Sequence, residues 1–230
     1  MTTGSPDQPG YFPVALRLDG RKCLVVGGGG VALRKVRGLL EYGGRVTVVA
    51  PVFCDGLLTL GQKGEVLLLE REYGENEAAD FDLVIAAVDR EEVNRRVFED
   101  CRENGILVNV VDDPERCDFI LSATVKRGPL TLSVGTQGTA PFLARWARER
   151  LEEMVPGHWE SMAVHAGAFR KAVLADTILE PETKYQLFRR FLETDWEKIL
   201  KEGGESRAEE EMRALLAEGR RPGGSSGFPE

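Results

Sequence analysis

Four consecutive glycines, Gly27 to Gly30, follow a short apolar run. They are the first motif in the sequence that could take part in chemistry. They fit the pattern G-x-G-x-x-G/A through Gly27, Gly29 and Ala32. In that pattern the first glycine permits a tight turn, the second lets a pyrophosphate approach the backbone, and the last small residue permits close packing of helix on strand. Because the N–H groups at a helix N-terminus attract anions, the motif predicts a dinucleotide-binding loop.

One part of the dinucleotide pattern is absent. An acidic residue that holds the ribose hydroxyl is expected about 20 residues further on, at the end of the second strand. The chain has Val49, Ala50 and Pro51 there, and no arginine that would bind a 2′-phosphate. This position therefore does not distinguish NAD from NADP.

Asp112 is a second feature that could do chemistry. It ends the predicted strand from Ile106 to Asp112. Ligands of open α/β sheets bind at the carboxyl ends of the strands, and a carboxylate there is suited to act as a general base. The alternative is that Asp112 forms a turn before Asp113 and Pro114. Asp113 is the nearest competitor for the base, although the following proline favours a turn role for it.

These residues need a scaffold, and the hydrophobic pattern predicts one with alternating strands and helices. The first helix should run from Val31 to Tyr42 and the second from Glu91 to Gly105. Apolar runs without alternation are typical of parallel strands that are covered on both faces. The pattern predicts a five-stranded, Rossmann-like, doubly wound parallel sheet, with strands at 23–26, 45–50, 65–71, 82–88 and 106–112.

The pattern changes after Asp112. Two extended runs joined by Gly-Pro predict an antiparallel hairpin within Phe119–Val134. A Gly/Thr loop follows, and then an amphipathic helix that ends near Met154, with Thr139 as the expected N-cap. We expect a Rossmann domain at 1–113, a hairpin and helix at 114–150 and a helical C-terminal domain at 151–202. Residues 203–230 are expected to form a flexible, Gly-rich tail with one short helical stretch inside it.

Composition sets limits on function. The chain has 230 residues, a net charge of −8 and a sequence pI near 5.1, which argues against a nucleic-acid partner. Its apolar runs are strand-sized, and its first ten residues lack the regions of a signal peptide, so we expect a cytoplasmic protein without membrane spans. The four cysteines form no C-x-x-C pair, and His158 and His165 have no zinc-like partners, so no metal site is expected.

Taken in order, the motifs resemble the precorrin-2 dehydrogenase and sirohydrochlorin ferrochelatase family, the NAD-dependent module of bacterial siroheme synthases. The resemblance extends from about Tyr11 to about Phe191. It is carried by YFPVALRL with CLVVGGGGVALRKVRGLLEYGGRVTVVAP, and by NVVDDPERCDFILSATVKRGPLTLSVGTQGTAPFLARWARERLE. The second stretch is more specific, because NVVD followed by an F-I hairpin, a Gly/Thr loop and P-x-L-A-R is typical of this family.

The resemblance implies roles for individual residues. Gly30 and Val31 of the glycine loop, with Pro51 and Val52 after the second strand, would contact NAD, and Asp112 would be the catalytic group. Thr136 stands in the Gly/Thr loop where some relatives have serine, and we treat it as a substrate-binding candidate. Our own hypothesis adds Arg145 to the substrate site. The resemblance also implies a homodimer formed through the hairpin region, and a missing acidic residue after the second strand is usual in the family.

The implied reaction is the NAD-dependent removal of two hydrogens from precorrin-2, which gives sirohydrochlorin in siroheme biosynthesis. A hydride goes to the nicotinamide and a proton to a base, for which Asp112 is suited. Some members also insert Fe²⁺, and there the tetrapyrrole nitrogens would be the metal ligands. Because the substrate carries many carboxylates, it needs local cations, for which Arg145, Arg148, Lys126 and Arg127 are candidates, together with the backbone amides of Gly135–Thr139.

A rival interpretation is a regulatory module in which a Rossmann domain senses NAD and catalyses nothing. Such modules usually keep the acidic residue after the second strand, and they have no use for the carboxylate that ends NVVD.

Overall fold

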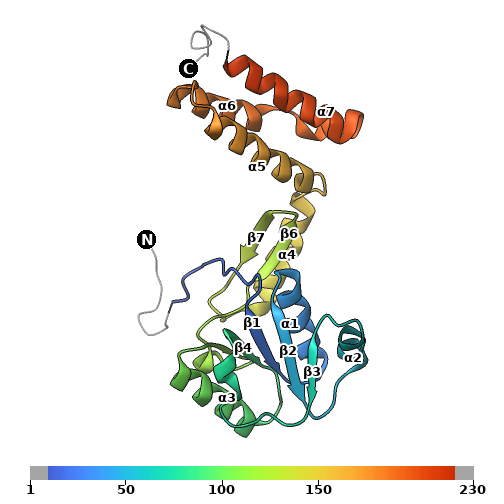
Figure 1. The fold of residues 1–230 in the computed structure, drawn as a ribbon, viewed down its shortest axis with the longest axis vertical. Coiled ribbons are helices and arrows are strands. Elements are labelled where there is room, and N and C mark those ends of the chain that lie inside the picture. Colours follow the sequence, from blue (N-terminus) through green and yellow to red (C-terminus); the bar gives the residue numbers. More distant parts are fainter. Residues whose placement is uncertain (1–9, 221–230) are drawn as a thin grey trace. The chain divides into compact units, whose positions relative to one another are not determined.

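A computed structural model describes residues 10–220 and divides them into two compact units. The first unit comprises the described residues up to Leu121 together with Gln137–Thr139. The second comprises Ser122–Thr136 and the chain from Ala140 onward. Figure 1 labels most of the helices and strands of both.

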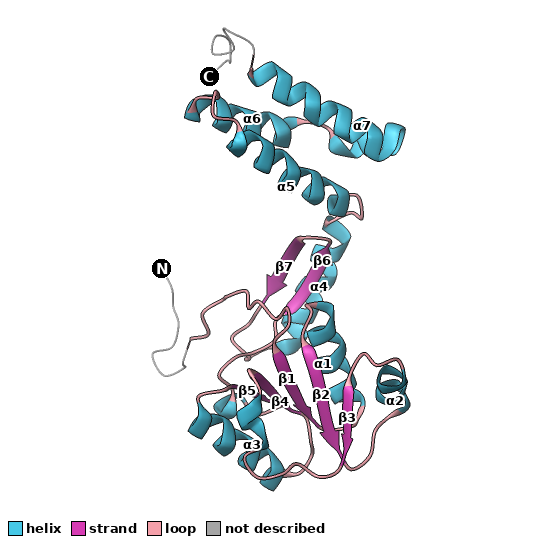
Figure 2. Cartoon of the chain, in the orientation of Figure 1, coloured by secondary structure: helices cyan, strands magenta, loops and turns pink. Residues whose placement is uncertain are grey.

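The first unit contains a parallel sheet, and its apolar runs form the strands. Its order is β3-β2-β1-β4-β5. The sequence therefore predicted both the five strands and the doubly wound arrangement (Figure 2). Residues of β1, β2, β4 and β5 are buried on both faces of the sheet, which explains why these strands read as continuous apolar runs. The strands are β1 (Lys22–Val26), β2 (Arg45–Ala50), β3 (Leu67–Glu70), β4 (Leu83–Ala86) and β5 (Leu107–Val110).

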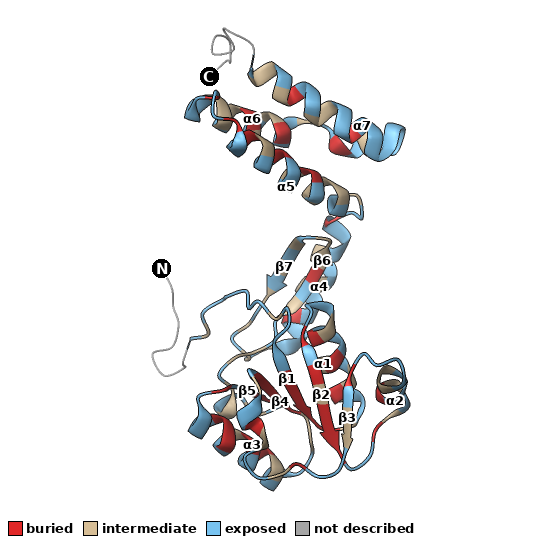
Figure 3. Cartoon of the chain, viewed as in Figure 1, coloured by how far each residue is buried: buried red, intermediate tan, exposed pale blue. Residues whose placement is uncertain are grey.

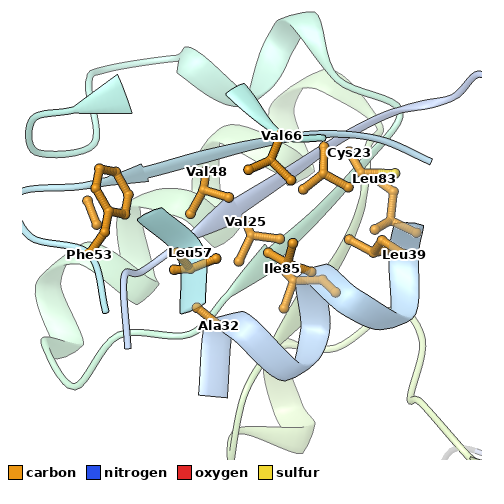
Figure 4. Close-up of a cluster of buried hydrophobic side chains, with 13 residues drawn as sticks. Cys23, Val25, Ala32, Leu39, Val48, Phe53, Leu57, Val66, Leu83 and Ile85 are labelled. Atoms are coloured by element: carbon orange, nitrogen blue, oxygen red, sulfur yellow. The ribbon is translucent and has the colours of Figure 1, made fainter. Parts of the chain in front are cut away.

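Helices cover both faces of this sheet. On one face α1 (Gly30–Glu41) and α2 (Asp55–Gln62) contribute to a core in which Ala32 and Leu39 of α1 lie near Val25 and Ile85 (Figure 4). Ala32 is fully buried, as expected for the last position of the glycine motif.

On the other face α3 (Glu91–Asn104) and the 3₁₀ helix η1 (Glu77–Asp80) cover the sheet. The sequence pattern did not predict α2, whose eight residues include two glycines and a single buried leucine. The predicted helix ends are confirmed in α1 and α3, because Gly43 and Gly105 adopt left-handed backbone angles there.

The second unit begins with the predicted hairpin. Its strands, β6 (Ala123–Arg127) and β7 (Leu130–Val134), pair only with each other, and α4 (Pro141–Met154) packs against both. Thr139 is not the N-cap of α4, because the helix begins at Pro141 and Ala140 occupies the N-cap position. Proline suits the first helical position, since its missing N–H would have no partner within the helix.

Three helices complete the second unit: α5 (Trp159–Ala175), α6 (Pro181–Glu193) and α7 (Trp196–Gly219). Each of these helices has buried residues (Figure 3), and they form one core that includes Phe169, Phe191 and Trp196. His165 of α5 lies in this region, buried, with its Nε2 2.7 Å from Oε2 of Glu205. This places His165 in a structural network.

The expectation of a flexible tail from residue 203 was wrong for residues 203–219. They belong to α7, and Ala208 and Leu215 are buried in the helical core. Gly204 has non-helical backbone angles and kinks the helix, so the glycine pair that suggested a tail instead marks a bend. The rest of the predicted tail, residues 221–230, lies outside the described residues. No helix of the described chain is both long enough and apolar enough to cross a membrane.

Candidate functional site

The glycine loop lies at the carboxyl end of β1, and two of its glycines are needed for packing. Gly27 has a φ of 130°, and a Cβ there would overlap the carbonyl oxygen of Ala87. A Cβ on Gly28 would overlap the carbonyl oxygen of Val52. Gly29 differs, since no described atom lies within 4 Å of its Cβ position. The space over Gly29 therefore remains available for a ligand.

A cleft of about 430 Å³ opens over this loop. It lies at the carboxyl ends of β1, β2 and β4, where the order of the strands changes direction, which is the usual ligand site of such sheets. All six residues predicted to contact the cofactor line it: Gly27, Gly29, Gly30, Val31, Pro51 and Val52. A larger hollow of about 650 Å³ lies at the opposite end of β2 and contains none of the predicted site residues.

The cleft also has lining residues that the sequence analysis did not identify. Glu72 and Tyr73 follow β3, and Arg90 precedes α3. Arg90 pairs with Glu72 at 2.7 Å and so links two loops that border the cleft. The Tyr73 hydroxyl is buried and donates to Asp100 at 2.7 Å, and burial raises the pKa of this hydroxyl. Tyr73 therefore lines the cleft in a fixed position and is not suited to act as a general acid.

Asp112 lies two residues beyond β5, at the same edge of the sheet. Its φ is 64°, an uncommon backbone conformation for a residue other than glycine and one that aspartate and asparagine adopt more readily than most. The N–H of Val111 donates to the carbonyl of Ala86 at 2.9 Å, and that of Asp113 donates to the carbonyl of Val110 at 3.2 Å. These bonds fix the backbone on both sides of Asp112, whose side chain is exposed to solvent.

Asp113 has a structural partner. It precedes the 3₁₀ helix η2 (Pro114–Arg116) and pairs with Arg116 at 3.1 Å, while Arg116 also pairs with Glu91 at 2.6 Å. The turn role that Pro114 suggested for Asp113 is therefore the one that its contacts support.

The turn after Asp112 is held by several contacts. The Sγ atom of Cys117 lies 3.2 Å from the carbonyl oxygens of Val110 and Asp113. The hydroxyl of Tyr11 lies 3.3 Å from the carbonyl oxygen of Pro114. Burial raises the pKa of the Cys117 thiol, which favours its neutral, hydrogen-bonding form.

Lys35 is a charged neighbour of Asp112 that the sequence analysis missed. It lies on α1, half-buried, and interacts electrostatically with Asp112 and Cys117. Burial lowers the pKa of the Lys35 ammonium group and nearby Arg34 lowers it further, while Asp112 and Cys117 act in the opposite direction. In the sequence Lys35 is one of several cations after the glycine loop, and only the fold distinguishes it.

Two further candidates, Thr136 and Arg145, belong to the second unit. Thr136 Oγ1 accepts a hydrogen bond from the N–H of Ala140 at 3.2 Å. The side chain of Arg145 is 79% exposed and pairs with Glu149 at 3.1 Å. A role in substrate binding stays a prediction for both residues.

The sequence is similar to a known protein family and to several known proteins. Residues 14–123 match the model of a family described as putative NAD(P)-binding. A siroheme synthase of Pseudoalteromonas translucida (strain TAC 125) is 44% identical over 163 residues, which cover 71% of this chain and 34% of the relative. Another, from Thioalkalivibrio sulfidiphilus (strain HL-EbGR7), is 41% identical over 212 residues, or 91% of this chain and 42% of the relative. The chain thus spans less than half the length of these relatives.

A solved structure has the same fold as most of this chain. It is described as SirC, precorrin-2 dehydrogenase, and matches with a TM-score of 0.72 over 89% of this chain and 100% of that chain. The sequences are 23% identical, so this match supports the architecture.

Proposed function

Because this chain is 44% and 41% identical to part of two siroheme synthases, we propose that it catalyses the NAD-dependent dehydrogenation of precorrin-2 to sirohydrochlorin. The observation that carries the proposal is the position of Asp112. This carboxylate follows β5 at the edge of the sheet where the glycine cleft opens, and its backbone is fixed on both sides. A dinucleotide cleft and a candidate base therefore share one edge of one sheet.

The glycine cleft fits a nicotinamide dinucleotide. Because α1 begins at Gly30, its first N–H groups have no acceptor within the helix and are available to a pyrophosphate. The absence of a side chain at Gly29 leaves room for that group, and Pro51 and Val52 line the same cleft. NAD, when bound, accepts the hydride that leaves the macrocycle.

Asp112 takes the second hydrogen in this proposal. Its carboxylate accepts the proton released as the macrocycle loses a hydride, so the substrate loses two hydrogens and two electrons. Exposure of the side chain lets it pass this proton to water after each turnover.

The charges of the cleft favour NAD over NADP. Its described lining contains two carboxylates, Glu72 and Asp89, and one cation, Arg90, which is already paired with Glu72. A 2′-phosphate would add negative charge where no lining cation is free to receive it. We therefore propose NAD as the cofactor.

Iron insertion into sirohydrochlorin is a second proposed activity, favoured by the siroheme synthases among the relatives. The macrocycle nitrogens would bind Fe²⁺ as it enters, and Asp112 would accept the protons that they release. The iron is then a substrate of the site.

We also propose a homodimer formed through the hairpin region. Within residues 10–220 the hairpin of β6 and β7 pairs with no other strand, and Val125 is the one buried residue of its two strands. Although α4 packs against the hairpin, every other residue of the two strands stays partly or fully exposed. Next to it α4 exposes Phe142 (78%) and Trp146 (55%), and a second chain would cover such apolar surface.

One assay tests the enzymatic proposal against the regulatory alternative. The purified chain is incubated anaerobically with precorrin-2 and NAD, and NADH formation is followed by absorbance; NADP replaces NAD in a parallel sample. We expect NADH to form in the sample with NAD, and NADPH to form only slowly in the sample with NADP. A chain that binds NAD in calorimetry but forms no NADH would instead support a sensing module.

A further inference from the structure

Three of the cations first suspected of binding substrate carboxylates, all arginines, already have acidic partners. Arg145 pairs with Glu149, and Arg148 pairs with both Glu149 and Glu152. Arg127 lies 3.8 Å from Glu152 and donates to the carbonyl of Val155. Each of these guanidinium groups would have to give up an existing contact to bind an anion.

The cations of α1 differ. Arg34, Lys35 and Arg37 lie within one turn of this helix, whose acidic residue is Glu41. Among residues 10–220, the structure contains no ion pair within 4.0 Å and no side-chain hydrogen bond for Lys35. Lys35 is half-buried, whereas Arg34 and Arg37 are exposed. A half-buried ammonium group has lost part of its hydration without gaining a protein partner.

Lys35 is also the α1 cation that interacts with Asp112. The two groups are close enough to affect each other electrostatically, but they form no ion pair, so the ammonium keeps its three donors and the carboxylate its acceptor positions. A cation beside a base matches a substrate in which a peripheral carboxylate lies near the carbon or nitrogen that loses a proton.

From this arrangement we propose that Lys35 binds a peripheral carboxylate of the tetrapyrrole and thereby places the reacting part of the macrocycle beside Asp112. This inference rests on the proposed substrate class and adds a residue to its site. The contact would be a charge-assisted hydrogen bond, and the anion would supply the partner that the half-buried ammonium lacks.

The test measures binding of the product, so that it does not depend on turnover. Sirohydrochlorin is titrated anaerobically into the full chain, and quenching of protein fluorescence gives the affinity. The variants are Lys35→Met, which keeps length without charge, Lys35→Gln, which keeps a polar group, and Lys35→Arg, which restores the cation. Arg37→Met is the matched control, because it removes an exposed cation from the same helix.

We expect Lys35→Met and Lys35→Gln to weaken sirohydrochlorin binding about tenfold or more, the usual scale for loss of a hydrogen bond to a charged group. Lys35→Arg should recover most of the affinity, Arg37→Met should stay within about twofold of wild type, and NAD affinity should not change. Added salt should weaken binding by the wild type more steeply than binding by Lys35→Met, because one ionic contact is missing in the variant.

Equal sirohydrochlorin affinity of the wild type and both neutral variants would overturn the assignment of Lys35, as would a wild type that does not bind sirohydrochlorin. The proposed dehydrogenation fails in a different way. A wild type that binds sirohydrochlorin through Lys35 but forms no NADH from precorrin-2 would keep the carboxylate site and refute the reaction.

Discussion

Gln137 and Tyr11 are 126 positions apart in the sequence and bind each other through two hydrogen bonds. The N–H of Tyr11 donates to Oε1 of Gln137 at 2.6 Å, and Nε2 of Gln137 donates back to the carbonyl of Tyr11 at 3.3 Å. The hydroxyl of Tyr11 also lies 3.4 Å from the carbonyl oxygen of Cys117. The N-terminal segment therefore connects the Gly/Thr loop with the turn that follows Asp112.

This relationship predicts that Gln137→Ala lowers the rate of NADH formation without changing NAD affinity. The loop would lose both bonds, each worth about 1 kcal/mol, and Gln137 has a φ of 55° that alanine adopts less readily. Gln137→Asn is the control, since asparagine tolerates this backbone angle but has a shorter side chain. An alanine variant with wild-type turnover would show that the connection does not position the site.

Gly29 gives a direct test of the cofactor cleft. Gly29→Asp should leave the fold intact, because no described atom lies near its Cβ position, and should strongly weaken NAD binding by placing a negative charge at the pyrophosphate position. Gly38→Asp, within α1, is the control, because Gly38 also lies in open space but does not line the cleft. Unchanged NAD affinity in calorimetry of a folded Gly29→Asp protein would refute the assigned role of the loop.

Removing the charge of Lys35 should have opposite effects on the stability of the fold and on sirohydrochlorin binding. Its pKa is lowered in the folded chain, so protonated Lys35 favours the unfolded state, and stability rises as pH increases from the folded pKa towards the unfolded value. Lys35→Met should therefore unfold at the same or a higher temperature than wild type at neutral pH, although it binds sirohydrochlorin less well. A variant that unfolds at a clearly lower temperature would indicate a structural role for the lysine.

The same shift makes tetrapyrrole binding pH-dependent. Only the protonated amine attracts a carboxylate, and with its lowered pKa Lys35 loses its charge at a lower pH than an ordinary lysine. Sirohydrochlorin affinity should decrease as pH rises through this range in the wild type, but not in Lys35→Met. The groups that influence Lys35 here are Arg34, Asp112 and Cys117, so Cys117→Ser should be titrated alongside to exclude a thiol effect.

The dimer proposal is tested by changing the apolar face of α4. Light scattering of the wild type should give about twice the chain mass of 25.4 kDa. Trp146→Glu should shift the protein towards the monomer, because a buried charge would oppose association. The control is Tyr185→Glu on α6, an exposed aromatic residue outside α4. A wild type that is monomeric at micromolar concentration would refute the dimer.

The sheet and its cofactor cleft could be predicted from the sequence because both follow local rules. Buried parallel strands appear as apolar runs such as Leu83–Ala86, and the positive φ of Gly27 belongs to a recognisable motif. The need for glycine at Gly28 could not be predicted, because it depends on the carbonyl of Val52, which the fold brings close.

Other features escaped prediction because they depend on tertiary contacts. Lys35 and Asp112 are far apart in the sequence, and only the fold brings them close enough for an electrostatic interaction. For residues 203–219 the sequence predicted only a short helical stretch in a flexible tail, because a glycine pair and many charged residues mask the pattern. Burial of Ala208 and Leu215 by other helices stabilises this part of α7. Where elements lack a strong local pattern, the packing partner decides the structure.

The most direct test of the central claim is the rate of NADH formation from precorrin-2 by folded Asp112→Asn protein at saturating NAD. Asparagine tolerates the φ of 64°, so the variant should fold, bind NAD normally and lose only the ability to accept a proton. We expect the rate to fall by about 10² or more, the usual scale for a lost general base, while Asp113→Asn retains most of its activity because its carboxylate pairs with Arg116. An Asp112→Asn rate within about twofold of wild type would contradict the account and place the base elsewhere.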